Sequence, residues 1–217
     1  GVGTQIQLRE NLTIGTDGPG TLSLNSQALL AAAEVVIDEG DLALNDGVLN
    51  AASVSVQSLG ELGGHGRVEA SLANEAGQVV VREQERLSFS RGASDGGHVN
   101  ASQMSVLGGE LAFDQPLTNT GQVVGRNATF RFDGGLDNNG TLGISSGDSD
   151  IFGAVTNGGQ IKLGGKSTTT FYDMAAIADG VLEMEADAKA VFLGGVTMTG
   201  ASQLRIAAAE PNDDGIV

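Results

Sequence analysis

The stretch that decides the fold is residues 130–165, FRFDGGLDNNGTLGISSGDSDIFGAVTNGGQIKLGG. A five-residue unit of glycine, any residue, apolar residue, any residue and apolar residue occurs twice in it, beginning at Gly140 and at Gly159. Alternation of apolar and other residues over three to five positions is typical of a short strand with one buried face. The spacing of the two copies indicates a structural repeat with a period of about 20 residues.

The same unit recurs along the chain. Further copies lie at residues 20–24, 40–44, 60–62, 109–113, 182–184 and 204–206, the third without its second apolar residue. Leu22, Leu42 and Leu62 follow this period, and so do Leu142, Ile161, Leu182 and Leu204 to within two positions. We therefore expect Leu142, Ile161, Leu182 and Leu204 to form one buried ladder.

A second ladder is expected from four phenylalanines. Phe132, Phe152, Phe171 and Phe192 recur with the same period of about 20 residues. Each is followed three or four positions later by an apolar residue, namely Leu136, Val155, Met174 and Val196. A biased composition makes such residues frequent but does not place them at a fixed spacing. Two ladders with one period therefore predict stacked coils. We expect all four phenylalanines to be buried in one row.

These repeats predict an all-β protein in which residues 1–217 form a single parallel β-solenoid domain, of the right-handed β-helix type, with about 20–25 residues per coil. The looser coils are expected at about residues 63–139 and the most regular at about 130–206. Roughly nine or ten coils at about 4.8 Å per coil give a rod of about 45 Å, with almost no helix. The Asn, Asp and Gly residues at 45–47, 137–140 and 156–159 are predicted to supply the positive φ of tight corners.

The amino-acid composition disfavours several classes of function for this chain, through its charge and its lack of cysteine. The chain has 27 acidic and 11 basic residues and a formal charge of −16, which disfavours nucleic acid as a partner. The absence of cysteine excludes disulfides and thiolate chemistry. No apolar run approaches about 18 residues, so membrane insertion is not expected. Residues 1–3 lack the features of a signal peptide, and the chain is expected to be a mature or excised piece.

Three phrases in the C-terminal half, at residues 147–159, 168–174 and 188–196, carry a resemblance to known proteins. They resemble the Phe-turn-Val-Asn-Gly coils of bacterial extracellular β-helix repeat proteins, the autotransporter-like and sorting-tail surface proteins of planctomycetes and cyanobacteria. The similarity is to a repeat style and covers about residues 130–206. It implies a secreted or surface-borne protein with a structural or adhesive role.

No catalytic, cofactor or metal site is expected with any force. Asp148 and Asp150 alternate outward on one segment, and Asp133 and Asp137 flank a corner one coil earlier, so that together they could form an oxygen-only calcium site. The favoured interpretation is that these aspartates cap turns. Calcium is the only cofactor that the sequence suggests.

Other polar clusters favour structural interpretations. His65 and His98 are expected to be exposed loop histidines. Arg82, Arg86 and Arg91, with Glu83 and Glu85, are expected to form a solvated face with weak ion pairs. Residues 168–170 are three threonines that could suggest ice binding, but residues 148–151 and 188–191 do not repeat them one coil away.

The leading hypothesis is a non-enzymatic, extracellular structural or adhesive rod, part of a bacterial surface protein, fibre or matrix. Its expected partners are neighbouring proteins or copies of itself, bound through the rod ends. The alternative is a polysaccharide-binding or polysaccharide-cleaving β-helix, with ice binding a weaker third hypothesis. Cleavage would require two carboxylates and a base within hydrogen-bond reach.

Overall fold

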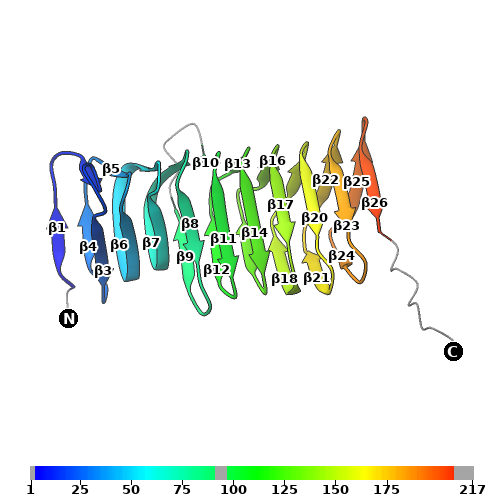
Figure 1. The fold of residues 1–217 in the computed structure, drawn as a ribbon, viewed down its shortest axis with the longest axis horizontal. Helices are drawn as coiled ribbons and strands as arrows, with labels where there is room; N and C mark the ends of the chain where they lie inside the picture. Colours follow the sequence, from blue (N-terminus) through cyan, green and yellow to red (C-terminus); the bar gives the residue numbers. More distant parts are fainter. Residues whose placement is uncertain (1–2, 91–96, 208–217) are drawn as a thin grey trace, which may run out of the picture.

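The structure is a computed structural model that describes residues 3–90 and 97–207. Within these ranges the chain forms 26 strands and no helix. Every strand pairing is parallel, and each strand of an inner coil pairs with its equivalents one coil before and one coil after it, in about 10 turns (Figure 1). The predicted all-β parallel solenoid is therefore confirmed.

Each coil contributes one strand to each of three sheets. β6 (Asp41–Val56) and β7 (Glu61–Asn74) run through two corners and contribute to all three. The first sheet also contains β3 (Thr21–Asn25), β8 (Gln78–Val81), β11 (Gln103–Leu107), β14 (Gln122–Arg126), β17 (Thr141–Ile144), β20 (Gln160–Leu163), β23 (Val181–Met184) and β26 (Gln203–Ile206).

The remaining strands complete the other two sheets. The second sheet contains β1 (Gln5–Gln7), β4 (Leu29–Ala31), β9 (Arg86–Phe89), β12 (Glu110–Phe113), β15 (Thr129–Phe132), β18 (Gly147–Phe152), β21 (Ser167–Phe171) and β24 (Lys189–Phe192). The third contains β2 (Leu12–Ile14), β5 (Glu34–Ile37), β10 (His98–Asn100), β13 (Leu117–Asn119), β16 (Leu136–Asn138), β19 (Val155–Asn157), β22 (Ala175–Ala178) and β25 (Val196–Thr199).

The register of the predicted aliphatic ladder is confirmed, and the ladder runs through the whole first sheet, but the predicted burial is wrong at Leu204. Its members in register are Leu22, Leu42, Leu62, Val79, Met104, Val123, Leu142, Ile161, Leu182 and Leu204. The spacing is constant from Met104 to Ile161, whereas the step from Leu62 to Val79 is shorter and the step from Val79 to Met104 is longer. All members from Leu42 to Leu182 are buried, whereas Leu204 in the last coil is 51% exposed.

The predicted ladder of four phenylalanines is wrong. Only Phe171 and Phe192 share a row, whereas Phe132 lies in the neighbouring inward row and Phe152 faces outward. Ile151, and not Phe152, lies in register with Phe130 and Phe171, while Phe152 pairs with Arg131 and points outward. Thr129 pairs with Asp150, a step of 21 residues, because the corner before β18 is two residues longer than the corner before β15. Counting 20 residues on from Phe132 therefore misses the register by one position. A slip of one position moves a side chain to the opposite face of a strand. For the same reason Ala175, and not Met174, follows Val155 in the third sheet.

The second sheet buries two rows side by side. One contains Phe89, Phe113 and Phe132, whose rings stack at centroid distances of 4.8 and 6.3 Å. The other contains Leu87, Leu111, Phe130, Ile151, Phe171 and Phe192. The repeat copy at residues 109–113 therefore belongs to this sheet and not to the aliphatic ladder of the first.

The third sheet carries a buried row that the sequence interpretation missed. Asn74, Asn100, Asn119, Asn138 and Asn157, here called the asparagine ladder, are fully buried. Each Nδ2 donates to the Oδ1 of the next member, at 2.7, 2.7, 2.6 and 2.5 Å in chain order. No residue of 137–140 or 156–159 has positive φ, so the prediction that these segments supply it is wrong. At residues 45–47 it is confirmed at Asp46.

Candidate functional site

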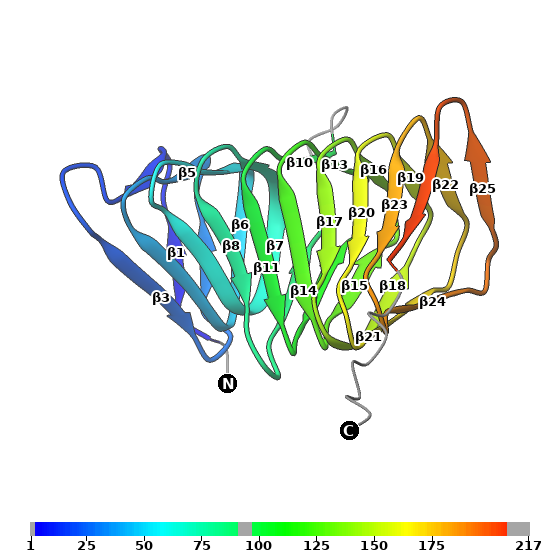
Figure 2. The same cartoon turned by 45° about the vertical axis from the view of Figure 1, so that its right-hand side comes forward.

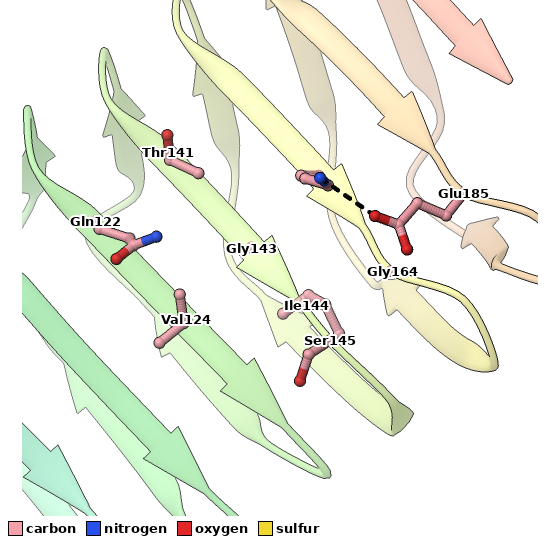
Figure 3. Close-up of a pocket in the computed structure, with 9 residues that line it drawn as sticks. Gln122, Val124, Thr141, Gly143, Ile144, Ser145, Gly164 and Glu185 are labelled. Carbon is pink, nitrogen blue, oxygen red and sulfur yellow. Dashed lines mark ion pairs between the residues drawn. The ribbon is translucent and has the colours of Figure 1, made fainter. Parts of the chain in front are cut away.

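One candidate site is a shallow pocket of about 260 Å³ on the outer face of the first sheet, here called the glycine pocket (Figure 3). Its base lies at Gly143 in β17, between Val124 in β14 and Lys162 in β20, its register neighbours. Gln122, Thr141 and Ser145 line its rim, and Lys162 and Glu185 form an ion pair beside it at 3.2 Å. The pocket exists because the side chain is missing at Gly143.

Gly143 differs from the other glycines within strands of the described chain. A Cβ added at Gly47, Gly63, Gly64, Gly66, Gly125 or Gly147 would come closer than 3.0 Å to a neighbouring atom, so packing requires glycine there. At Gly143 the nearest atom to such a Cβ is Cγ1 of Val124 at 3.5 Å, an ordinary contact. Its φ is not positive. Packing and backbone conformation therefore give no reason for glycine at this position.

The lysine beside the pocket is paired with two carboxylates. Lys162 lies 3.9 Å from Glu183 and 3.2 Å from Glu185. The backbone N–H of Gly165 donates to Glu185, and this bond, followed by the ammonium of Lys162, lowers the pKa of the Glu185 carboxyl. Glu183 also accepts a hydrogen bond from the side-chain amide of Gln160 at 2.9 Å. The lysine is thus held between two carboxylates.

A second polar cluster lies on the outer face of the second sheet. Glu110 pairs with Arg86 at 3.3 Å and with Arg131 at 3.0 Å, one coil away on each side. Arg82 pairs with Glu61 at 2.9 Å in the first sheet. Arg82 and Arg86 are solvated as predicted, but among the described residues their ion pairs are with Glu61 and Glu110 in neighbouring coils and not with Glu83 or Glu85. Arg91 lies outside the described residues.

The outward row that contains Phe152 is aromatic. The guanidinium of Arg131 lies 4.3 Å from the Phe152 ring centroid, and Phe152 stacks on Tyr172 at 4.2 Å. The carboxylate of Asp150 raises the pKa of the Tyr172 hydroxyl. Of the seven phenylalanines and one tyrosine, these are the two whose rings lie on the outer surface. The Phe152 ring thus lies between Arg131 and Tyr172 and connects three adjacent coils.

The two histidines occupy different environments. His65 is exposed as expected, but it lies in strand β7 and not in a loop. Its Nδ1 accepts a hydrogen bond from the backbone N–H of Arg86 at 3.1 Å. His98 is fully buried in β10, so the expectation that it is an exposed loop residue is wrong. Its Nδ1 accepts from the N–H of Leu72 at 3.2 Å, and its ring packs against Phe89 and Phe113. Burial lowers the pKa of His98 to about 4.

The aspartates and threonines singled out in the sequence are not gathered into a site. Asp148 and Asp150 both point outward on β18, as expected. Among the described residues, no group of three or more His, Cys, Asp or Glu side chains is placed to hold a metal ion. Thr169 points inward and is buried. The register neighbours of Thr168 and Thr170 one coil earlier are Asp148 and Asp150, so the threonine row does not repeat.

The two ends of the described stack expose apolar side chains. Figure 2 shows β24, β25 and β26 as the last strands of the three sheets. In this C-terminal coil Val196, Leu204 and Ile206 are 43%, 51% and 67% exposed. At the other end Ile6 of β1 is 44% exposed.

Comparison with known proteins gives no relative. No protein-family model, curated protein or solved structure matches this chain. In the part of the chain that the structure describes, no helix is long and apolar enough to cross a membrane.

Proposed function

We propose that this chain is a non-enzymatic structural rod of a bacterial surface protein, fibre or matrix, located outside the cell. The observation that carries the proposal is that polar side chains connect successive coils. The asparagine ladder links five coils through buried amides, and Glu110 joins Arg86 to Arg131 across three. These amide, carboxylate and guanidinium groups hold successive coils together along the rod axis.

The physical properties suit a spacer. Each inner coil is held by parallel strand pairing on both sides and by inward rows that contact the same rows above and below, so rod length scales with coil number. A net charge of −16 makes sideways association of rods unfavourable. Contacts with neighbours are therefore expected at the ends, where apolar side chains are exposed.

We further propose that the ends bind another β-coil, either from an adjoining protein or from a second copy. In the described part of the chain, the C-terminal coil has free edges on strands β24, β25 and β26, which belong to the second, third and first sheets in that order. The N-terminal coil of the described stack has free edges on β1, β2 and β3, which belong to the same three sheets in the same order. A copy stacked on the end would continue all three sheets. Strand edges readily pair with other strands in this way.

Light scattering and electron microscopy of the purified chain test the end contacts. We expect concentration-dependent end-to-end assembly, which the double substitution Leu204→Lys and Ile206→Lys abolishes. Leu59→Lys serves as the matched control, because Leu59 is 83% exposed at a corner away from the ends. A chain that stays monomeric at high concentration would contradict assembly between copies.

Two measurements test the rod role itself. Immunogold labelling in the organism of origin should place the protein outside the cell, and labelling confined to the cytoplasm would contradict the proposal. Incubation with polysaccharides, followed by assays for new reducing ends and for unsaturated sugar products, should show no turnover. Catalytic release of either product would replace the rod role with that of an enzyme.

A further inference from the structure

We propose that the glycine pocket binds one sugar ring of an uncharged polysaccharide whose chain runs along the rod axis over the first sheet. This inference does not depend on the rod role. It starts from Gly143, the strand glycine that neither packing nor φ explains. Glycine within a strand weakens it and often marks a position where a ligand approaches the backbone closely.

The surface next to Gly143 is a track with two parallel rows. One row of outward residues contains Gln78, Gln103, Gln122, Thr141 and Gln160 in successive coils. The row beside it contains the small side chains of Val80, Ser105 and Val124 before it reaches Gly143. A line of polar side chains, four of them amides, therefore borders a row of small side chains that ends at the glycine pocket.

The chemistry of the track fits a neutral, hydroxyl-rich chain. Primary amides and hydroxyls such as Gln122, Thr141 and Ser145 both donate and accept hydrogen bonds, as sugar hydroxyls require. The methyl groups of Val124 and the bare backbone at Gly143 offer an apolar base for the C–H face of a pyranose ring. Successive coils repeat at about 4.8 Å, so the donors and acceptors recur along the direction of the chain.

Charge argues against an anionic ligand. The nearest cation, Lys162, is held by Glu183 and Glu185, and the whole chain carries −16. A uronic acid or sulfated polymer would meet net negative charge as it approached. An uncharged polysaccharide meets no such barrier.

Isothermal titration calorimetry tests the proposal with β-1,4-linked hexasaccharides of glucose, xylose and mannose, the corresponding single sugars, and polygalacturonate. At least one neutral hexasaccharide should bind. Gly143→Leu fills the pocket and should weaken that binding about tenfold or more, while the thermal midpoint is retained because a Cβ has room there. Ala43→Leu is the control, since Ala43 lies in the same outward row several coils earlier.

The remaining outcomes are decisive. Hexasaccharide binding that exceeds single-sugar binding supports the extended track, whereas equal affinities would overturn it. Failure of every neutral hexasaccharide to bind, a preference for polygalacturonate, or equal weakening by Gly143→Leu and Ala43→Leu would overturn the pocket assignment. None of these results bears on whether the chain is a rod, because localisation and assembly are measured separately.

Discussion

The coils between Met104 and Asn157 and the C-terminal coil have the same repeat but different burial. Phe130 in β15 is fully buried, whereas Phe192 in the same row is only partly buried. Leu142 and Leu204 share the aliphatic ladder, yet the first is buried and the second is half exposed. Residue type is the same in each pair, so burial is decided by whether a coil has a neighbour on both sides.

The asparagine ladder shows the same contrast along the third sheet. It links the inner coils and stops where Ile177 follows Asn157 in register. At its other end the Oδ1 of Asn74 is buried without a hydrogen-bond partner. Inner coils thus combine apolar burial with hydrogen-bonded amides, whereas the last coils rely on apolar contacts and strand pairing. Substitutions at equivalent positions should therefore differ in cost between the two regions.

The largest difference is expected for the phenylalanine row. Phe130→Ala should lower the free energy of unfolding by about 3–5 kcal/mol, because stacked coils on both sides cannot close the cavity. Phe192→Ala should cost about 1 kcal/mol, since its ring is already partly exposed. Chemical denaturation of both variants measures this difference. Equal costs would mean that burial does not depend on neighbouring coils.

Acid should destabilise the inner region through His98. Its folded pKa of about 4 lies below the ordinary value of 6.5, so the fold favours the neutral ring. That contribution is complete above about pH 6.5 and is lost as the pH falls towards 4, about 3 kcal/mol in all. Denaturation between pH 7 and 4 should show this slope, and His98→Gln should reduce it. An unchanged slope in His98→Gln would assign the acid sensitivity to other groups.

Removing one rung of the asparagine ladder should have a somewhat smaller effect. Asn119→Ala leaves the Nδ2 of Asn100 and the Oδ1 of Asn138 without their ladder partners, at a cost of about 2–3 kcal/mol. Asn139→Ala, at an exposed neighbouring position, should stay within about 0.5 kcal/mol. Thermal and chemical denaturation compare the two. Similar costs would show that the amides do not stabilise the stack.

The smallest effect is expected on the outer surface. Arg131→Gln removes the contact with Phe152 and the ion pair with Glu110, and should cost about 0.5–1 kcal/mol. Part of this loss should disappear in high salt, because the ion pair is screened. Lys189→Gln provides a control in β24. If Arg131→Gln lowered the free energy of unfolding as much as Asn119→Ala, the outer face would stabilise the stack more than we expect.

The sequence predicts the aliphatic ladder well because a glycine directly precedes most strands of the first sheet. This glycine marks where each strand begins and therefore which of its residues point inward. It predicts the second sheet less well, since corners differ in length between coils, and an error of one position in the register exchanges the inner and outer faces of a strand, as at Phe152. The asparagine ladder was missed because asparagine is common in turns, although Asn100, Asn119, Asn138 and Asn157 recur at a constant spacing. The glycine pocket gave no signal, because only the surrounding atoms show which glycines are required.

The central claim is that coils of constant length stack in register between Met104 and Ile161, and deletion of one coil tests it most directly. Removing residues 123–141 joins Gln122 to Leu142, which takes the place of Val123, and brings Asn119 against Asn157. X-ray scattering and thermal unfolding should show a cooperative rod shorter by about 4.8 Å, whereas removal of residues 123–132 should prevent folding of the neighbouring coils. If both deletions were tolerated equally, or if both unfolded the chain, the stacked-coil account would be contradicted.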